Sequence, residues 1–160
     1  MSGLQYFNYK GYGTEKAEKQ FRYSQAVRVG DTIQCSGQGR SYSFCHTSDV
    51  PEVDIAPGGW DPETGDFPKT KEINAQIDQA FRNVDLALKA AGSKGWEQVY
   101  RVNSYHLPLN DESQEAMVRN FRKWMPDHKP LWTCVGVTRL GFDDMRVEIE
   151  VQAYAPKDKQ

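Results

Sequence analysis

Apolar residues recur at helical spacing between Glu72 and Ala91, and this is the clearest pattern in the chain. The repeat comprises Ile73, Ile77, Ala80, Phe81, Val84, Leu88 and Ala91. Because a period of about 3.6 residues puts these positions on one stripe, the pattern predicts an amphipathic helix with a buried face. Gly92 follows the last apolar position and predicts a left-handed cap that ends the helix.

A second helix is predicted to begin at a cap provided by Asp111 or Ser113 and to end at Pro126. Its apolar positions again have the spacing of one helical face. The predicted inner face comprises Met117, Phe121, Trp124 and Met125.

Runs rich in β-forming residues predict the strands. They are Gln5–Tyr12, Tyr23–Arg28, Thr32–Ser36, Trp96–Leu107, Leu131–Leu140 and Arg146–Tyr154. Gly30 and Asp31 predict a hairpin turn between the second and third runs, and Gly141–Asp144 predicts another between the last two. This order of strands and helices favours an α+β fold, a mixed β-sheet with both helices packed on one face.

The segment Gln38–Pro68 has no sustained periodicity and is rich in Gly, Ser and Pro. Loops longer than roughly 12–15 residues are usually lids, binding loops or disordered segments. Tyr42, Phe44 and Trp60 are among the apolar residues with which this segment could pack against the domain. Two interpretations stay open here, a functional loop and a surface insertion.

The length of 160 residues corresponds to one domain. The chain has 20 basic and 22 acidic residues, so its formal net charge is −2. General nucleic-acid binding is not expected, because it needs a basic surface. Hydrophobic residues make up 38% of the chain. Such a lean core predicts that subunit contacts supply part of the buried surface.

No stretch approaches the roughly 20 apolar residues that a membrane span needs, and Met1–Gly13 lacks the basic and apolar pattern of a signal peptide. Cys35, Cys45 and Cys134 are odd in number and widely spaced, unlike a disulfide framework or a zinc site. We therefore expect a soluble intracellular protein. The cytoplasm is the default compartment, and the mitochondrion is the alternative.

Sequence signatures of well-known sites are missing from the chain. It has no phosphate-binding glycine loop, no GxSxG, no HExxH and no CxxC. His46, His106 and His128 are scattered, and we interpret His106, on a predicted strand, as a hydrogen-bonded structural residue. We expect neither a metal nor a cofactor.

Two segments remain as places for chemistry. In Cys35–Gln38 a predicted strand stops at Gly37. In Arg146–Val151, alternation points Glu148 and its acidic neighbour away from the helices and the aliphatic residues toward them. The simpler interpretation of that acidic face is solvation. A carboxylate there becomes a useful base only if another subunit covers it, because partial burial raises its pKa.

These segments belong to a longer ordered pattern in the chain. It comprises Tyr23–Val27, Gly30–Ile33, Cys35–Gln38, Asp61–Gly65, Gln76–Val84, Ala90–Ser93, Pro130–Leu140 and Val147–Glu150. The pattern resembles the RidA/YjgF family of reactive-intermediate deaminases, some members of which carry the older label endoribonuclease L-PSP. The resemblance implies a mixed sheet backed by two helices, assembled as a homotrimer with pockets between neighbouring subunits. It implies a single domain over residues 1–160 with a loop insertion at 39–59.

In family members known as deaminases, the pocket hydrolyses enamines and imines released by pyridoxal-phosphate enzymes. An arginine clamps the substrate carboxylate there, and a glutamate positions or activates water. By resemblance, Glu148 corresponds to the glutamate, Tyr23 to a pocket tyrosine, and Ser36 beside Gly37 to a pocket serine. Cys134 corresponds to a cysteine that forms a pocket wall.

The clamping arginine is missing, because Trp132 stands two residues after Pro130 where that arginine is expected. Loss of a bidentate clamp costs on the order of 2–5 kcal/mol of carboxylate binding, since an indole offers one N–H only. Val118 likewise stands where an asparagine is often found. Arg40 is the candidate replacement cation, whereas Arg139 is expected to face the opposite side of its strand from Trp132. The alternative is that Trp132 forms an aromatic wall for a larger or uncharged ligand.

Three functions remain in competition. The first is hydrolysis of an imine, enamine or related C–N bond of a small metabolite other than 2-aminoacrylate, with Glu148 handling water and the inserted loop acting as a lid. In that lid, Tyr42, Phe44 or His46 would reach inward. The second is a non-catalytic trimer that binds a small ligand or acts as a chaperone, which the missing clamp favours. The third is a ribonuclease, which the acidic composition and the lack of a histidine pair oppose.

Overall fold

The structure is a computed structural model of the chain, and it describes residues 3–39 and 72–157. Residues 40–59 of the predicted insertion, which include Arg40 and the proposed lid, lie outside the described residues. The elements in chain order are β1 (Leu4–Phe7), α1 (Tyr12–Phe21), β2 (Ala26–Val29), β3 (Thr32–Gln38), α2 (Ile73–Ala90), the 3₁₀ helix η1 (Trp96–Gln98), β4 (Val99–His106), α3 (Asp111–Trp124), β5 (Leu131–Gly136) and β6 (Val147–Tyr154).

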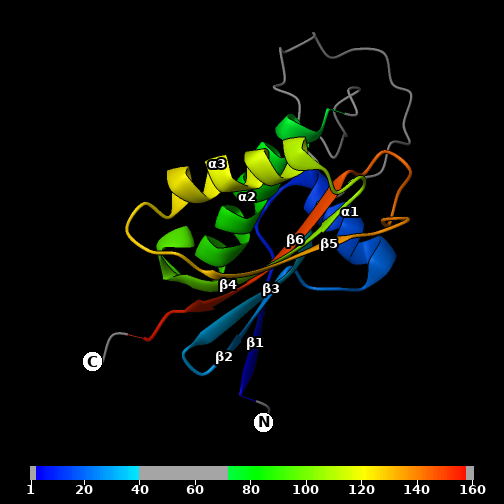
Figure 1. Ribbon diagram of the computed structural model, residues 1–160. Coiled ribbons are helices and arrows are strands. Elements are labelled where there is room, and N and C mark those ends of the chain that lie inside the picture. The colour runs from blue at the N-terminus through cyan, green and yellow to red at the C-terminus, as the bar shows by residue number, and fades with distance from the viewer. Residues whose placement is uncertain (1–2, 40–71, 158–160) are drawn as a thin grey trace, which may run out of the picture.

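The described strands form one sheet in the order β1-β2-β3-β6-β4-β5 (Figure 1). Neighbouring strands are antiparallel except β4 and β5, which are parallel. The predicted hairpin of β2 and β3 is confirmed, because Arg28 pairs with Ile33 across the turn. Gly30 has the left-handed backbone, with φ 59°, that this turn requires.

The second predicted hairpin, between the runs 131–140 and 146–154, is wrong. β5 ends at Gly136 and pairs with β4, whereas β6 lies between β3 and β4. The physical reason is that β4, α3 and β5 form a strand–helix–strand unit, and such a crossover places its two strands parallel in one sheet. That long-range pairing replaces the local hairpin.

Helices α2 and α3 lie side by side over one face of the sheet (Figure 1). This confirms the predicted α+β architecture. The Glu72 carboxylate caps α2 by accepting hydrogen bonds from the backbone N–H groups of Asn74 at 2.8 Å and Ala75 at 2.7 Å. Gly92 follows the helix at φ 83°, as the sequence predicts. We call the face of the sheet away from α2 and α3 the open face.

The cap of α3 is Asn110, and neither Asp111 nor Ser113 takes that position as predicted. Asn110 Oδ1 accepts from the Ser113 N–H at 3.0 Å, and Ser113 Oγ accepts from the Asn110 N–H at 3.0 Å. This reciprocal capping box satisfies two backbone donors at the start of the helix. Ser113 thus supports the cap from inside the helix.

Helix α1 is not among the elements that the sequence predicts, and the predicted strand Gln5–Tyr12 shortens to β1. The segment reads YGTEKAEKQF, in which most residues are polar or charged. It contains good helix formers but no apolar stripe, so periodicity alone does not detect it. Its last residue, Phe21, contacts the Phe142 ring edge to face, with the centroids 6.4 Å apart.

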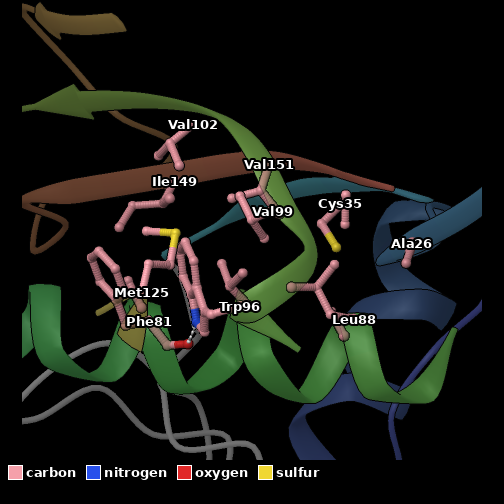
Figure 2. Packing of buried hydrophobic residues seen from close by; sticks show 14 of the residues in the cluster. Ala26, Cys35, Phe81, Leu88, Trp96, Val99, Val102, Met125, Ile149 and Val151 are labelled. Atoms are coloured by element: carbon pink, nitrogen blue, oxygen red, sulfur yellow. Dashed lines mark hydrogen bonds between the residues drawn. The ribbon is translucent and has the colours of Figure 1, made fainter. Parts of the chain in front are cut away.

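The hydrophobic core fills the space between the sheet and α2 (Figure 2). Phe81 stacks on Trp96 with centroids 4.4 Å apart, and Trp96 Nε1 donates to the Phe81 carbonyl at 2.8 Å. Ile149 and Val151 of β6 point into this core, as alternation predicts. The intervening residues of β6 therefore face the open face.

Candidate functional site

The open face carries two acidic side chains of β6, Glu148 and Glu150. Asn103 Nδ2 donates to Glu150 Oε1 at 2.7 Å, and the Tyr105 hydroxyl donates to the same oxygen at 3.1 Å. Both donors lie on β4, whose register places Asn103 opposite Glu150 and Tyr105 opposite Glu148. The predicted direction of the two carboxylates is confirmed, and Glu150 is fixed by two hydrogen bonds.

Glu148 is half-buried and lies against the backbone of Gly37 on β3. A Cβ atom at position 37 would stand 2.6 Å from both Cγ and Cδ of Glu148 and closer still to Oε1. Glycine is therefore the residue that leaves room for this carboxylate. Burial, and to a lesser extent the charge of Glu150, raises the pKa of Glu148 above its ordinary value. Such a shift brings a carboxylate closer to the pH range in which a general base works.

The strand that carries Gly37 is irregular, because the register of β3 with β6 shifts between Cys35 and Gln38. Ser36 Oγ donates to the Gln25 carbonyl at 3.2 Å, and the Ser36 N–H donates to the same carbonyl at 2.9 Å. These two bonds tie the irregular part of β3 to the start of β2. The structure thus brings together the two segments that the sequence singles out for chemistry.

The other expected pocket residues are more dispersed. Tyr23 lies between α1 and β2 with 39% of its surface exposed. It is two residues from Gln25, whose carbonyl accepts from Ser36, so it shares an end of the sheet with that serine. Val118 is half-buried on α3, over the other face. Arg40 lies outside the described residues.

Trp132 and Cys134 lie on the helix-covered side of β5. The parallel register places Trp132 opposite Val102 and Cys134 opposite Ser104, and both of these β4 residues are buried. Trp132 Nε1 donates to Ser104 Oγ at 2.8 Å. The indole also meets the Phe121 ring of α3 edge to face, with centroids 5.0 Å apart. One chain therefore places the indole and the β6 carboxylates on opposite faces of its sheet.

The expectation for Arg139 is wrong in its premise, because β5 ends at Gly136 and strand alternation does not extend to residue 139. Arg139 Nη2 lies 3.7 Å from Asp143 Oδ1, and both side chains are exposed. An ion pair of this kind contributes little to stability, because water screens it. Arg139 is thus part of the connection between β5 and β6.

Neither cysteine in the described ranges has the character of a nucleophile. Burial raises the pKa of the Cys35 thiol to about 12. Burial also raises the pKa of the half-buried Cys134 thiol, against the smaller opposing effect of a hydrogen bond from Ser104. Reactive cysteines have lowered pKa values, so both thiols suit a packing role. Residues 3–39 and 72–157 contain no group of three or more side chains that could hold a metal ion.

Sequence reasoning missed three polar residues of β4 that surround these groups, Asn103, Ser104 and Tyr105, and identified only their neighbour His106. Asn103 and Tyr105 hold Glu150 on the open face, whereas Ser104 and His106 lie on the helix side. His106 Nε2 lies 2.9 Å from Ser104 Oγ, which confirms His106 as a hydrogen-bonded structural residue. Burial lowers the pKa of His106 to about 4, so the imidazole is neutral at neutral pH. The sequence does contain a signal for these residues, because polar residues occupy both faces of this strand.

A shallow hollow of about 230 Å³ lies on the open face beside Glu150. Its lining is mainly polar and comprises Gln34, Cys35, Arg101, Asn103, Glu150, Val151 and Gln152. Ligand pockets typically enclose 70–90% or more of a ligand's surface, in volumes of roughly 300–1,000 Å³. The described part of one chain thus provides only part of such an enclosure. In the same residues, no helix is long and apolar enough to cross a membrane.

Comparisons with known proteins agree with this architecture over most of the chain. The sequence profile of the endoribonuclease L-PSP family matches residues 14–155. A RutC family protein of Pyrococcus abyssi is 32% identical over 142 residues, which cover 88% of this chain and 93% of the relative. The RutC family protein YjgH of Escherichia coli is 30% identical over 146 residues, which cover 91% of this chain and 92% of the relative.

Solved structures show the same fold. The structure of protein YjgH has a TM-score of 0.69 at 25% identity, and the match covers 98% of this chain and 99% of that one. Escherichia coli TdcF with bound serine has a TM-score of 0.60 at 25% identity, with 82% and 87% covered. RidA from a Psychrobacter species has a TM-score of 0.61 at 26% identity, with the same coverage. The chain therefore belongs to the RidA/YjgF family, which is also described as the endoribonuclease L-PSP family.

Proposed function

We propose that the protein hydrolyses an imine, enamine or related C–N bond of a small metabolite, in a cleft between copies of this chain, with Glu148 as the base. The observation that carries the proposal is the placement of Glu148. Its carboxylate is half-buried over Gly37, and its pKa is raised. A relative supports a small metabolite as the ligand, because Escherichia coli TdcF was solved with bound serine, a small amino acid.

The cleft between copies is proposed because Glu148 and Trp132 occupy opposite faces of the sheet. Glu148 lies on the open face, and Trp132 lies toward α3 at the edge strand β5. Two copies can bring these groups together if the open face of one meets the β5 edge of the next. A ring of three copies would close this arrangement, with one site at each junction.

Exposed apolar side chains on the open face support such an assembly. The side chains of Tyr6 on the edge strand β1, Tyr154 at the end of the central strand β6 and Leu131 on the edge strand β5 are 62%, 57% and 65% exposed. The registers of β1 with β2 and of β3 with β6 align Tyr6 with Val27 and Tyr154 with Thr32. Large apolar side chains gathered on one sheet face are typical of an interface between proteins.

The proposed reaction needs one proton acceptor and a site from which bulk water is excluded. Glu148 accepts a proton from a water molecule, whose oxygen attacks the carbon of the protonated imine and forms a neutral carbinolamine. Glu148 then returns this proton to the carbinolamine nitrogen, and the C–N bond breaks as the hydroxyl oxygen forms the carbonyl. The hydroxyl proton passes to the departing ammonia, which leaves as ammonium. One water is consumed, and Glu148 returns to its charged form. Its raised pKa suits both steps, because the group must gain and lose the proton near neutral pH.

The substrate is proposed to differ from 2-aminoacrylate, the usual small carboxylate. Trp132 stands in place of the clamping arginine, and its single N–H already donates to Ser104. The ring instead offers apolar surface, which favours an uncharged or larger substituent.

The test is a screen of the purified protein against imines generated in situ from a range of amino acids and amines. Glu148→Gln keeps the shape of the side chain and removes the proton acceptor. We expect it to lower turnover by about 10²–10⁴-fold, the usual contribution of a general base. Light scattering should give the mass of three chains. A monomer, or full activity in Glu148→Gln, would refute the proposal.

A trimer that binds a ligand without turning it over is the second candidate. The observation in its favour is the Trp132–Ser104 hydrogen bond, which leaves the position of the clamp without a donor. Under this function, Glu148→Gln retains ligand affinity and no imine is consumed by either protein. Under the first function the same variant binds the ligand but loses turnover.

A further inference from the structure

A serine that is fully buried joins two rings beneath α3. Ser104 lies on β4 with no exposed surface. Its Oγ accepts a hydrogen bond from Trp132 Nε1 at 2.8 Å and lies 2.9 Å from His106 Nε2. An indole has one donor and no acceptor, so this bond uses the whole hydrogen-bonding capacity of Trp132.

Two contacts determine how the Trp132 ring lies. The Ser104 bond holds its nitrogen end toward the buried strand β4. The Phe121 ring of α3 meets it at an interplanar angle of 82°, which sets the tilt of the ring plane. One contact comes from the sheet and the other from a helix, so the ring cannot turn its N–H outward without losing the first.

The neighbours of Ser104 also orient its hydroxyl group. A serine has one proton to donate, and the bond from Trp132 occupies one of its lone pairs. The proton can then go to His106 Nε2, which is buried and neutral, or to Cys134 across the strand pair. Because the hydroxyl proton has a partner on the other side, a lone pair of Ser104 Oγ stays directed at the indole N–H.

We propose that Ser104 is a positioning residue that makes Trp132 a wall without hydrogen-bond donors, so that the ligand group seated there is an aryl or hydrocarbon group and not a carboxylate. This inference rests on the proposed function, in which Trp132 borders the ligand cleft. A carboxylate placed against the ring would lose its water without gaining a hydrogen bond. The negative face of the aromatic ring would also repel it. An aryl group instead gains apolar contact and ring packing.

The hydrogen bond itself can be tested without any ligand. The indole N–H signals of the ¹⁵N-labelled protein are recorded, and Trp132→Phe assigns the one that belongs to Trp132. We expect its exchange with deuterium to be at least ten times faster in Ser104→Ala than in wild type. Ser104→Thr, which keeps the hydroxyl, should exchange slowly, and Ser104→Cys replaces the alanine variant if that one does not fold. Equal exchange rates in wild type and Ser104→Ala would overturn the positioning role.

The ligand preference is tested with two stable ketones, acetophenone and phenylglyoxylate. Acetophenone carries a methyl group where phenylglyoxylate carries a carboxylate. Wild type is expected to bind acetophenone at least ten times more tightly, and Trp132→Arg should reverse the order. In Ser104→Ala, the preference for acetophenone over phenylglyoxylate, measured as the ratio of their Kd values, should fall by at least threefold. The reason is that the freed N–H of Trp132 can turn toward the carboxylate. Wild-type preference for phenylglyoxylate would overturn the inference.

The two measurements separate failure of this inference from failure of the proposed function. If the Trp132 N–H exchanges slowly and neither ketone binds, the proposed cleft and the ligand class are both refuted, and the Ser104 bond stands. If the ketones bind with the expected order but Glu148→Gln leaves imine hydrolysis unchanged, the hydrolase role is refuted while the ligand class is supported.

Discussion

Replacing Gly37 by alanine should disable the site while leaving the fold intact. The added Cβ would stand 2.6 Å from Cγ and Cδ of Glu148. Those two carbons must retreat by about 0.8 Å to reach the 3.4 Å at which ordinary van der Waals contact begins, and Oε1, which would stand closer still, must retreat further. The backbone of Gly37 is not in the left-handed region, so alanine itself is tolerated there. The strain therefore falls on the flexible side chain of Glu148.

The magnitude follows from that displacement. A misplacement of about 1 Å at a catalytic group costs on the order of 10²-fold in rate, which corresponds to about 2.7 kcal/mol of transition-state stabilisation. The free energy of unfolding should change little, because a tolerated Gly→Ala change contributes about 0.4–1 kcal/mol of stability through the unfolded chain. That gain offsets part of the cost of moving Glu148.

Two assays check this prediction, together with a matched glycine. The first is kcat/KM for a substrate found in the imine screen. The second is an NMR titration of Glu148, whose pKa should fall toward its ordinary value when the carboxylate leaves its half-buried place. Gly30→Ala is the control: it has φ 59° and no atom within 4 Å of the added Cβ, so it should lose stability and keep activity. Wild-type turnover with an unchanged titration in Gly37→Ala would refute the reasoning.

Three further predictions concern stability. The raised pKa of Glu148 means that the folded state holds its proton more tightly, so Glu148 favours folding at low pH and loses that contribution as the pH rises through its folded pKa. Glu148→Gln should therefore be more stable than wild type at neutral pH, by thermal unfolding, with a difference that disappears in acid. Arg28 is buried and donates to the carbonyls of Ala91, Gly92 and Ala155. Arg28→Met should cost roughly 2–4 kcal/mol by urea unfolding, because all three acceptors lose this donor, and an unchanged midpoint would contradict this. Asn110→Ala removes the α3 cap and should cost about 1 kcal/mol in the same assay. A stability equal to that of wild type would contradict the capping role of Asn110.

The parts of the fold that the sequence predicts are those built from local periodicity. Helix α2 follows from an apolar stripe, and the β2–β3 hairpin follows from a glycine turn between two alternating runs. The alternation of β6 likewise identifies its buried and open faces. In each case the information lies within a few residues, so it does not depend on which element is the neighbour.

The parts that the sequence could not provide depend on partners far along the chain. The pairing of β5 with β4 joins Trp132 to Val102, and nothing in either run identifies the other. Helix α1 lacks an apolar stripe altogether. The Trp132–Ser104 bond spans 28 residues. It requires the parallel register of β4 and β5, and it requires both side chains to lie on the same face of the sheet. Periodicity gives the face of a residue within its own strand, but not which strand lies beside it.

That limit bears directly on the candidate site. The resemblance assigns Glu148 and Trp132 to one pocket, and alternation places each on one face of its own strand. Only the register shows that the two faces are opposite sides of a single sheet. The proposed pocket is therefore completed by association, and substitutions at the exposed Tyr6 or Tyr154 should weaken assembly and activity together. A chain that stays monomeric yet turns over substrate would need a different base from Glu148, or a different wall from Trp132.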